Sequence, residues 1–313
     1  MEENNALTKG SAVDEYIIDS VLGGGGFSIV YKAHHHETEK PVVIKEYMPQ
    51  KLAKRINDCE VVSKSKVDES SFVKGKKLFI QEATSLATLK HENIVNVITF
   101  FPANGTNYMV MDEVKGVNLQ SYIRKQQGQL SEKLLRIVFV ESLKALHVIH
   151  EQKMLHLDIK PGNIHLRPGG KPLLLDFGAV RESQGSRLYD TKLVATAGFA
   201  PIEQITERGY LGPWTDIYAM GATIRSCIDG KALPPSKERK QNDTLKPAVE
   251  AFENQYTPEF LQIIDWSTEI DPEARPQNCE SLIKEIDALP DVDSFKPEKP
   301  KGLFSQIKNK LFK

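Results

Sequence analysis

The stretch His156–Gly178, with the sequence HLDIKPGNIHLRPGGKPLLLDFG, is the most informative part of this chain. It places three short polar side chains, Asp158, Asn163 and Asp176, at fixed spacing between aliphatic runs. Two buried strands joined by a turn at Pro168–Gly170 would explain the aliphatic runs. Two carboxylates and an amide are, however, costly to bury without a partner. Mg²⁺ prefers such oxygen ligands and usually accompanies phosphates, so the stretch indicates a magnesium and phosphate site.

This stretch resembles the catalytic loop and DFG segment of eukaryotic-type (Hanks-type) protein kinases. The resemblance implies that Asp158 orients the substrate hydroxyl and accepts its proton, and that Lys160 neutralises the γ-phosphate of ATP. It implies that Asn163 and Asp176 hold Mg²⁺, with Mn²⁺ as an alternative metal. Family members with a lysine at the place of Lys160 phosphorylate Ser and Thr. The expected activity is therefore that of a serine/threonine protein kinase, autophosphorylation included.

Composition and charge are consistent with this interpretation. The chain has 313 residues, of which 40% are hydrophobic and 27% charged, as is ordinary for a globular protein of about two domains. Its net charge of −1 gives no reason to expect nucleic-acid binding. The three cysteines are scattered, which fits a reduced cytoplasmic setting without disulfides or zinc. The polar N-terminus is not a signal peptide, and charged residues interrupt the most apolar helical run, Leu134–Ile149.

A glycine-rich segment, GGGGFS at Gly23–Ser28, separates two β-prone runs near the N-terminus. Glycines let backbone amides approach phosphates, although four glycines can also form a plain flexible loop. No GK[ST] follows, so it is not a Walker A loop. The segment resembles the kinase glycine-rich loop, with Ser28 at the family's third glycine. The resemblance places these residues around ATP: Leu22, Gly23, Gly24, Gly25, Gly26, Phe27, Ser28 and Val30.

The run Pro41–Lys45 (PVVIK) resembles the kinase third strand, whose lysine contacts the α- and β-phosphates. Its expected carboxylate partner is Glu82, although a surface position is the alternative for that residue. Glu82 lies in a helical pattern whose apolar side is expected to hold Leu78, Phe79, Leu86 and Leu89. Residues 46–77 are expected to form a charged, irregular insert of undisclosed role.

Two further strands are expected at His91–Phe101 and Asn107–Val114. The resemblance places Met111 at the gatekeeper position and Asp112–Val114 in the hinge that binds adenine. Within the hinge, Asp112 and Val114 are the expected ATP contacts. Asn118 is placed at a ribose contact. Val43 and His165 depart from the usual residues above and below adenine, and an ordinary strand histidine is the alternative for His165. His34–His36 are expected in a solvated turn, because adjacent side chains do not converge on one metal.

The second half of the chain is expected to be helical. Asn118 and Ser131 look like helix N-caps, and a helix is predicted at Glu132–His150. Further along, three matches to the family follow in order. The first is TAGFAPIEQ at Thr196–Gln204, whose acid is Glu203. The second is Asp216, which is expected to support the catalytic loop, and the third is Arg275, which is expected to pair with Glu203. Thr196 is expected to bridge Asp158 and Lys160. KEYMP and FAPIEQ look more like bacterial members than animal ones.

The expected fold is α+β: a bilobal protein-kinase fold with a small β-rich N-lobe carrying one main helix and a larger α-helical C-lobe. The N-lobe is placed at about 14–114 and the C-lobe at about 115–290, giving a kinase domain at 14–290. Residues 1–13 are assigned to an N-terminal tail and 291–300 to a linker. A Pro- and charge-rich solvated loop is expected at 231–247.

Several family features are absent. The arginine that normally grips a phosphate on the activation loop is replaced by Leu157. Two acids that basophilic kinases use against substrate arginines are replaced by Gly162 and Ser226. Two alternatives stay open at this point: a small-molecule phosphotransferase of the aminoglycoside type, and a pseudokinase scaffold. Lys160 and the Glu203/Arg275 pair argue against the first, and the complete catalytic set argues against the second.

The C-terminal segment 301–313, KGLFSQIKNKLFK, has the pattern of a short basic amphipathic helix. It is expected to dock on the kinase domain as a short helix, to remain a frayed tail, or to make a weak, reversible contact with the inner face of the membrane. The partners implied by the family are protein substrates with Ser or Thr and a cognate phosphatase. Nucleic acid is not among them.

Overall fold

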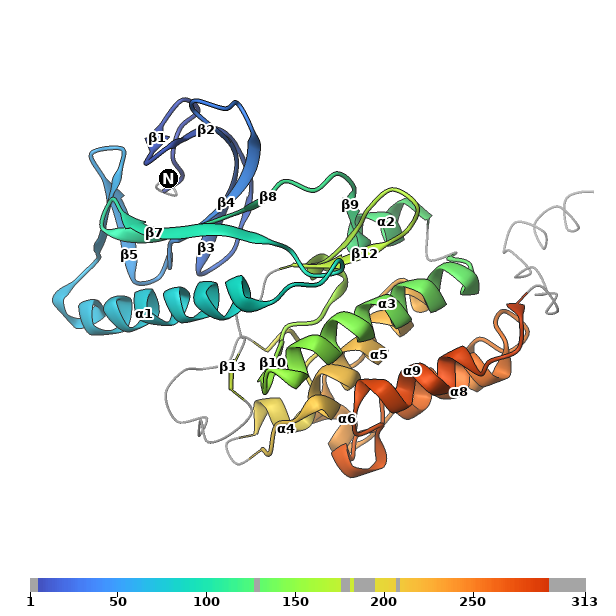
Figure 1. The fold of residues 1–313 in the computed structure, drawn as a ribbon. Helices are drawn as coiled ribbons and strands as arrows, with labels where there is room; N and C mark the ends of the chain where they lie inside the picture. Colours follow the sequence, from blue (N-terminus) through green and yellow to red (C-terminus); the bar gives the residue numbers. More distant parts are fainter. Residues whose placement is uncertain (1–4, 127–129, 176–180, 183–194, 207–208, 293–313) are drawn as a thin grey trace, which may run out of the picture.

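The computed structural model describes residues 5–126, 130–175, 181–182, 195–206 and 209–292. A sheet and one long helix form the N-terminal part, and helices make up most of the C-terminal part (Figure 1). This arrangement confirms the predicted bilobal α+β fold. The boundaries 14–290 stay a prediction, and the last described helix ends at Asp287.

The N-terminal sheet has six antiparallel strands in the order β1-β2-β3-β4-β8-β7. Their bounds are β1 Ala12–Val13, β2 Tyr16–Gly24, β3 Ser28–His35, β4 Pro41–Tyr47, β7 Val97–Ala103 and β8 Thr106–Asp112. The strands are rich in β-branched and aromatic residues, and burial alternates along β3, as expected for a sheet with two unlike faces. One face packs into the core through Tyr31, Ile44 and Val110.

The predicted irregular insert at 46–77 is wrong. Its middle is a hairpin of β5 (Ala53–Ile56) and β6 (Glu60–Ser63), and the helix α1 (Lys66–Thr88) begins directly after it. The hairpin turns at Asn57 and Asp58, which have φ values of 48° and 57°. Asn and Asp tolerate this left-handed conformation, so the turn did have a sequence signal. The Ser65 side chain caps α1 by accepting from the Asp68 N–H.

The N-terminal residues 5–13, assigned from sequence to a tail, instead pack on the sheet. Leu7 is buried, and its N–H donates to the Tyr31 hydroxyl. Arg55 of the hairpin donates to both the backbone and the side chain of Asn5. The same Arg55 reaches the fully buried carboxylate of Glu46, which also accepts from the hydroxyls of Tyr31 and Tyr108. This network joins the N-terminus, the hairpin and the strand that carries Lys45.

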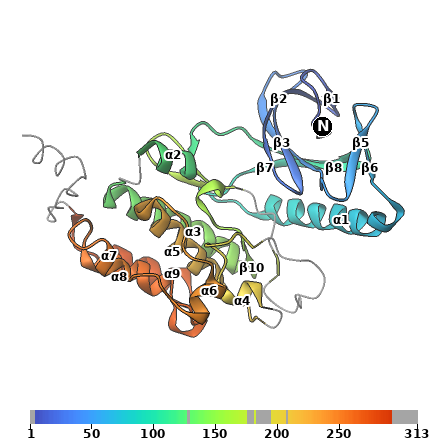
Figure 2. The ribbon, with the colours of Figure 1, turned by 180° about the vertical axis from the view of Figure 1, so that it is seen from behind.

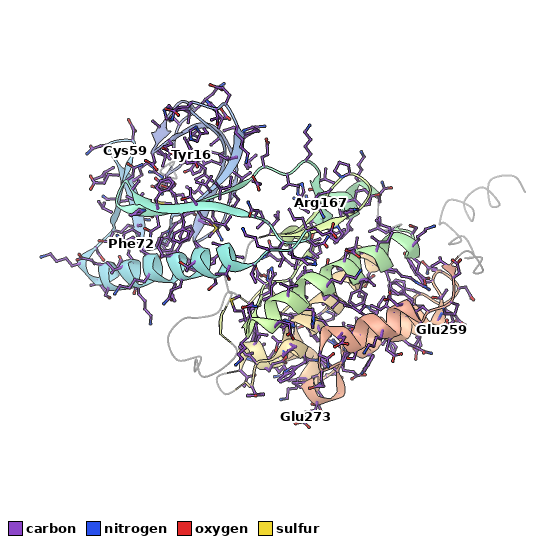
Figure 3. The ribbon with its side chains drawn as sticks, in the orientation of Figure 1. Tyr16, Cys59, Phe72, Arg167, Glu259 and Glu273 are labelled. Atoms are coloured by element: carbon purple, nitrogen blue, oxygen red, sulfur yellow. The ribbon has the colours of Figure 1, made fainter. Side chains whose placement is uncertain are left out.

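The helix α1 packs along one side of the sheet, with Phe72 near its first turns (Figure 3). Phe72 and Phe79 lie against Tyr47 of β4. Phe79, Leu86 and Leu89 are buried as predicted, but Leu78 is 40% exposed because it lies outside the buried stripe of the helix. The strand predicted at His91–Phe101 begins only at Val97. The residues before it turn toward the C-terminal lobe, where the Asn93 side chain donates to the Pro172 carbonyl at 2.7 Å.

The C-terminal lobe is organised around α3 (Glu132–Glu151) and α5 (Pro213–Asp229). The predicted helix at Glu132–His150 and its Ser131 cap are confirmed. Nearly all residues of α5 are buried, so α5 is the central helix of the lobe. The other helices are α2 Leu119–Gln126, α4 Ile202–Ile205, α6 Ser236–Gln241, α7 Ala248–Ala251, α8 Pro258–Ser267 and α9 Cys279–Asp287. Figure 2 shows α7, α8 and α9 on the side of this lobe away from the N-terminal sheet.

Short strands connect the lobes and shape the surface where they meet. They are β9 Val117–Asn118, β10 Met154–Leu155, β11 Ile164–Leu166, β12 Pro172–Leu174 and β13 Arg181–Glu182. Strands β12, β11 and β9 form a small sheet, and β10 pairs with β13. A 3-10 turn at Pro161–Asn163 leads directly into β11.

Two sequence predictions concern the periphery of the C-terminal lobe. The loop predicted at 231–247 contains the helix α6, whose Arg239 is buried and bonded to Tyr218, Asp243 and the Thr268 carbonyl. The linker at 291–300 and the segment 301–313 lie almost wholly outside the described residues. Within the described part of the chain, no helix combines the length and the apolar character that crossing a membrane requires.

Candidate functional site

The catalytic-loop residues Asp158 and Lys160 form a closed triangle with Thr196. Lys160 Nζ lies 2.7 Å from Asp158 Oδ2 and donates to Thr196 Oγ1 at 3.1 Å. The Thr196 hydroxyl donates to Asp158 Oδ1 at 2.9 Å, which confirms the predicted bridge. The carboxylate is thereby held in one orientation between a cation and a hydroxyl, as expected of a group that must be positioned before it accepts a proton.

Asn163 completes this group from the end of the 3-10 turn. Its Nδ2 donates to the Asp158 carbonyl and to Asp158 Oδ2, each at 2.9 Å. With the nitrogen engaged, the amide oxygen is the atom of Asn163 that can bind a metal, and Mg²⁺ takes such oxygen ligands. The second predicted ligand, Asp176, lies outside the described residues. The preceding residue, Leu175, donates its N–H to the Asn163 carbonyl at 2.8 Å. The residue directly before Asp176 is therefore bonded to Asn163.

Asp216 supports the loop from α5, as predicted. This fully buried carboxylate accepts from the backbone N–H groups of His156 and Leu157 at 2.9 and 2.8 Å, and it lies 2.8 Å from His150 Nε2. Burial alone would raise the pKa of Asp216, but the hydrogen bond and charge of His150, with the His156 charge and the Leu157 N–H, bring this pKa below its usual value. The carboxylate is therefore ionised where the loop needs an acceptor.

Leu157, at the position of the family arginine, has an unusual backbone conformation. Its φ is 62°, in the left-handed region that a leucine rarely adopts, and its side chain is buried. Asp216 holds the Leu157 N–H, while the buried side chain of Gln204 donates to the Leu157 carbonyl at 2.7 Å. These two contacts hold a strained peptide next to Asp158.

Lys45 and Glu82 meet as predicted, although they are 37 positions apart in sequence. Lys45 Nζ lies 3.0 Å from Glu82 Oε1, and the two side chains are only 8% and 10% exposed. The ammonium also lies 5.9 Å from the centre of the Phe79 ring. The arrangement holds a largely desolvated cation between β4 and α1.

The predicted glycine-loop residues lie together at the β2–β3 turn. Leu22 and Phe27 are more than half exposed, and the four glycines from Gly23 onward are also exposed. The turn is nevertheless held in place, since the N–H groups of Met48 and Gln50 donate to the carbonyls of Phe27 and Gly26. The segment that follows Lys45 therefore supports the loop from behind.

The strand register brings the remaining predicted side chains to one face of the sheet. Val30 lies directly opposite Lys45, and Val43 lies opposite Met111. Directly opposed residues of antiparallel strands share a face, so Val30, Val43, Lys45 and Met111 line the same side. Ser28 lies farther along the same strand, at the start of β3.

His165 is the predicted adenine contact in the C-terminal lobe. It lies in the middle of β11, opposite Asn118 of β9. Gly116 has a φ of 146°, and a Cβ on it would clash with the Leu166 carbonyl and His165 Nε2, so glycine is required there. Burial lowers the pKa of His165, and its interaction with the Val114 backbone opposes this only in part. The imidazole is therefore neutral at physiological pH.

Two predicted contacts have other partners in this structure. The Asp112 carboxylate accepts from Lys40 and Asn96, and its N–H donates to the Asn96 carbonyl, so both groups already have partners within the protein. Asn118 Oδ1 accepts from the Ser121 N–H at 2.7 Å and so caps α2 as predicted. Its amide nitrogen has no part in this cap and can donate to a ribose oxygen. Val114 lies in the connection between β8 and β9.

Glu203 and Arg275 form the predicted buried ion pair. Arg275 donates to both oxygens of Glu203, at 2.7 and 3.2 Å, and to the carbonyls of Trp214, Glu269 and Ile270. The Arg275 side chain is completely buried, and Glu203 also accepts from Thr215. The pair ties the segment after Thr196 to the base of the C-terminal lobe.

Sequence reasoning missed three residues that hold this site in place: Asn93, His150 and Gln204. None has a local signal, because each acts on a partner distant in sequence. His34, His35 and His36 lie at the end of β3 and in the following turn, each near a carboxylate of Glu15, Asp19, Glu37 or Glu39. No group of three His, Cys, Asp or Glu residues suited to a metal is found within the described ranges.

Comparisons with known proteins agree with this geometry. A family model described as "Protein kinase domain" matches residues 16–286. The chain is 31% identical over 229 residues to serine/threonine-protein kinase PknA of Nostoc sp., covering 70% of this chain and 37% of that protein. It is 29% identical over 271 residues to serine/threonine-protein kinase STE20 of Candida glabrata, covering 83% of this chain and 26% of that protein.

Similarity extends to solved structures. The apo form of PpkA-294 superposes with a TM-score of 0.81 at 37% sequence identity, covering 90% of this chain and 100% of that one. The chain spans less than two thirds of the length of the curated relatives described above, at 37% and 26%. The similarity to them therefore concerns one domain of longer proteins.

Proposed function

Because this chain belongs to the protein kinase family, we propose that it transfers the γ-phosphoryl group of ATP to Ser and Thr hydroxyls of proteins, itself included. The observation that carries the proposal is the Asp158, Lys160 and Thr196 triangle, with Asn163 bonded to the same carboxylate. A lysine placed beside the carboxylate is the feature expected of kinases that act on Ser and Thr.

In the proposed reaction, Asp158 orients the incoming hydroxyl and accepts its proton as the hydroxyl oxygen bonds to the γ-phosphorus, while the bond from that phosphorus to the bridging oxygen breaks and ADP leaves. Lys160 offsets the negative charge of the γ-phosphoryl group during transfer, and Thr196 keeps the carboxylate and the ammonium in register. A bound Mg²⁺, which Asn163 and Asp176 would hold, neutralises charge on the β- and γ-phosphates. The protein itself forms no covalent bond in this reaction, so positioning and charge account for most of the rate acceleration.

The nucleotide is proposed to lie between the glycine turn and β11. Lys45, fixed by Glu82, would contact the α- and β-phosphates, while the exposed turn Gly23–Ser28 would bring backbone amides close to the phosphates. Adenine would lie between Val30, Val43 and Met111 on the sheet and His165 below, with backbone groups of Asp112 and Val114 at its edge. Asn118 would reach the ribose with its amide nitrogen.

The test is incubation of the purified chain with Mg-ATP, followed by mass spectrometry of its own phosphosites. We expect phosphoserine or phosphothreonine, and phosphate incorporation should disappear in Asp176→Ala. Transfer to an aminoglycoside but not to protein would support a small-molecule phosphotransferase instead. No transfer to either acceptor, with intact ATP binding, would support a pseudokinase.

Activity is proposed not to depend on prior phosphorylation of the activation segment. Leu157 is buried and uncharged where the family has an arginine, and Gln204 and Thr196 already fasten the segment to the catalytic loop. Phosphatase-treated protein should therefore be active from its first turnovers. The check is a rapid-quench time course before and after phosphatase treatment, with the phosphatase removed. A lag that prior phosphorylation of Thr191 abolishes would contradict this expectation; Thr191 itself lies outside the described residues.

Nucleotide affinity is expected to fall at low pH because of His165. Burial already lowers its pKa, and a bound adenine would bury the imidazole further and lower the pKa again. His165 then takes up a proton at a higher pH in the free protein than in the nucleotide complex. Affinity for the nucleotide therefore falls as the pH drops through the pKa that His165 has in the free protein. Each further unit of lowering weakens binding about tenfold at pH values below both pKa values.

Calorimetric titration of Mg-ATP between about pH 7.5 and 5.5, the range in which a histidine titrates, checks this expectation. The variant His165→Leu should lose the part of the pH dependence that comes from this histidine. The matched control is His36→Gln, which changes an exposed histidine far from the sheet face. Equal pH profiles for the wild type and His165→Leu would refute a role for the imidazole beneath adenine.

The setting that follows from this function is the cytoplasm, with Ser- or Thr-containing proteins as substrates and a cognate phosphatase to reverse the reaction. Docking of segment 301–313 on the kinase domain and its weak peripheral contact with membrane both stay predictions, because the segment lies outside the described residues.

A further inference from the structure

The carboxylate of Glu46, the residue directly after Lys45, lies at the centre of a buried polar cluster. Glu46 is fully buried, and its carboxylate accepts from the hydroxyls of Tyr31 and Tyr108, each at 2.7 Å. Arg55 of the β5–β6 hairpin supplies a positive charge: its Nη2 lies 2.6 Å from Glu46 Oε2, and its side chain is only 4% exposed. A carboxylate that water does not reach depends on such a partner, so Arg55 keeps Glu46 in the interior.

Further contacts fix the guanidinium of Arg55 in this place. Its Nε donates to the Asn5 carbonyl at 2.8 Å, and its Nη1 donates to the carbonyl of Cys59, which is labelled in Figure 3. The backbone N–H of Arg55 donates to the Asn5 side chain at 3.0 Å. The planar guanidinium offers its donors in a rigid fork, so these contacts set its orientation against Glu46.

The strand β4 is held from both faces at its C-terminal end. Successive side chains of a strand point to opposite faces, so Glu46 lies on one face and Lys45 and Tyr47 on the other. On this second face Lys45 reaches Glu82 of α1. A Cβ on Gly75 of α1 would lie 1.8 Å from the Tyr47 hydroxyl oxygen, so only glycine permits this close approach. Three consecutive residues therefore fix β4 between α1 and the hairpin that carries Arg55.

The hairpin and α1 are themselves joined through the turn between β7 and β8. The Val61 N–H of the hairpin donates to the Asn104 carbonyl at 2.8 Å. Lys76 of α1 donates from Nζ to the next carbonyl, that of Gly105, at 3.1 Å. The hairpin, α1 and β4 thus form one connected frame around the ion pair between β4 and α1.

We propose that Arg55 is a positioning residue of the phosphoryl transfer proposed above, on which this inference rests. Through Glu46 it holds β4 where Lys45 can meet Glu82, with 3.0 Å between Lys45 Nζ and Glu82 Oε1. Without Arg55 the buried Glu46 carboxylate loses its counter-charge and has to move toward water, and the neighbouring Lys45 moves with the strand. A displacement of about 1 Å can cost a positioned group about 10²-fold in its effect on the rate.

The experiment measures the affinity of the full chain for Mg-ATP by calorimetry in the wild type, Arg55→Met, Lys45→Met and the double variant. Arg55→Met should weaken binding about tenfold, as for loss of one charge-assisted contact. Lys45→Met keeps the proposed adenine contacts and should still bind, and in this background Arg55→Met should weaken binding no further. An arginine that acts only on stability would lower the melting temperature without this dependence on Lys45.

A conservative variant and a matched control accompany this cycle. Arg55→Lys keeps a cation beside Glu46 but cannot also reach the two backbone carbonyls, so it should lose less affinity than Arg55→Met. Because it retains the charge balance of the cluster, the same cycle with Arg55→Lys decides the question if Arg55→Met does not fold. The control is Arg239→Met, which removes a similarly buried arginine paired with Asp243 in the other lobe. It should lower the melting temperature and leave the affinity for Mg-ATP unchanged.

Three outcomes would overturn the proposal. They are wild-type affinity in Arg55→Met, an equal loss with and without Lys45, and a loss in Arg239→Met as large as that in Arg55→Met. A wild-type chain that does not bind Mg-ATP would contradict the proposed function itself, and this inference with it.

Discussion

Asp158→Asn is expected to reduce turnover by roughly 10²–10⁴-fold, the usual contribution of a positioned general base. The amide cannot accept the hydroxyl proton. In one orientation its NH₂ group lies beside the Lys160 ammonium, and in the other it replaces the oxygen that accepts from Thr196. Affinity for the nucleotide should change little, since no proposed adenine or phosphate contact involves Asp158. The measurement is the rate of single-turnover phosphoryl transfer to a protein substrate at saturating Mg-ATP.

The matched control is Asp287→Asn, which makes the same chemical change at an exposed position at the end of α9. It should keep the wild-type rate. If Asp158→Asn also kept that rate, Asp158 would not be the base, and the catalytic role of the triangle would have to be abandoned.

Breaking the Glu203–Arg275 pair should give the largest loss of stability. Either Glu203→Gln or Arg275→Met leaves a buried charge without its partner, and such changes typically cost about 3–5 kcal/mol in the free energy of unfolding. Changing both residues together should cost less than the sum of the single changes, because no unpaired charge remains. Urea unfolding followed by fluorescence measures all three variants.

Lys284→Met is the control for this prediction. Lys284 forms an ion pair with Glu280 on the surface of α9, where water screens both charges, so its loss should have little or no effect. Additive losses from Glu203→Gln and Arg275→Met, or losses no larger than that of Lys284→Met, would contradict the interpretation of the pair as a buried, coupled unit.

The parts of the site predicted from sequence are those whose residue types and order carry the chemistry. Lys45 and Glu82 could be paired across 37 positions because a buried ammonium requires a carboxylate and the family resemblance identified Glu82 as that partner. The contacts of Thr196 with Asp158 and of Arg275 with Glu203 followed from the family resemblance in the same way. The bilobal fold followed from the same resemblance, and the strand patterns before Asp112 and the helical patterns after Ser131 agreed with it.

The parts that could not be predicted depend on contacts between distant segments with no motif. Arg55 has no neighbour that marks it as the partner of Glu46 and Asn5, so the N-terminal segment looked like a tail. Gln204 is an ordinary polar residue in sequence, and only the fold places it against the Leu157 carbonyl. The hairpin in 46–77 was missed for a different reason, since the Asn57 and Asp58 turn was present but its flanking strands are short.

The account's central claim is that this arrangement of charges transfers phosphate from ATP to protein Ser and Thr. The most direct test compares the wild type with Lys45→Met, using radiolabelled ATP, a generic Ser- and Thr-containing protein as substrate, and identification of the phosphorylated residues. Lys54→Met, which changes a partly exposed lysine of the β5–β6 hairpin, is the matched control. The account predicts phosphoserine and phosphothreonine with the wild type and Lys54→Met, and a loss of roughly 10²–10³-fold with Lys45→Met, as for removal of one transition-state charge contact. Equal incorporation by all three proteins, or phosphate found only on tyrosine, would contradict it.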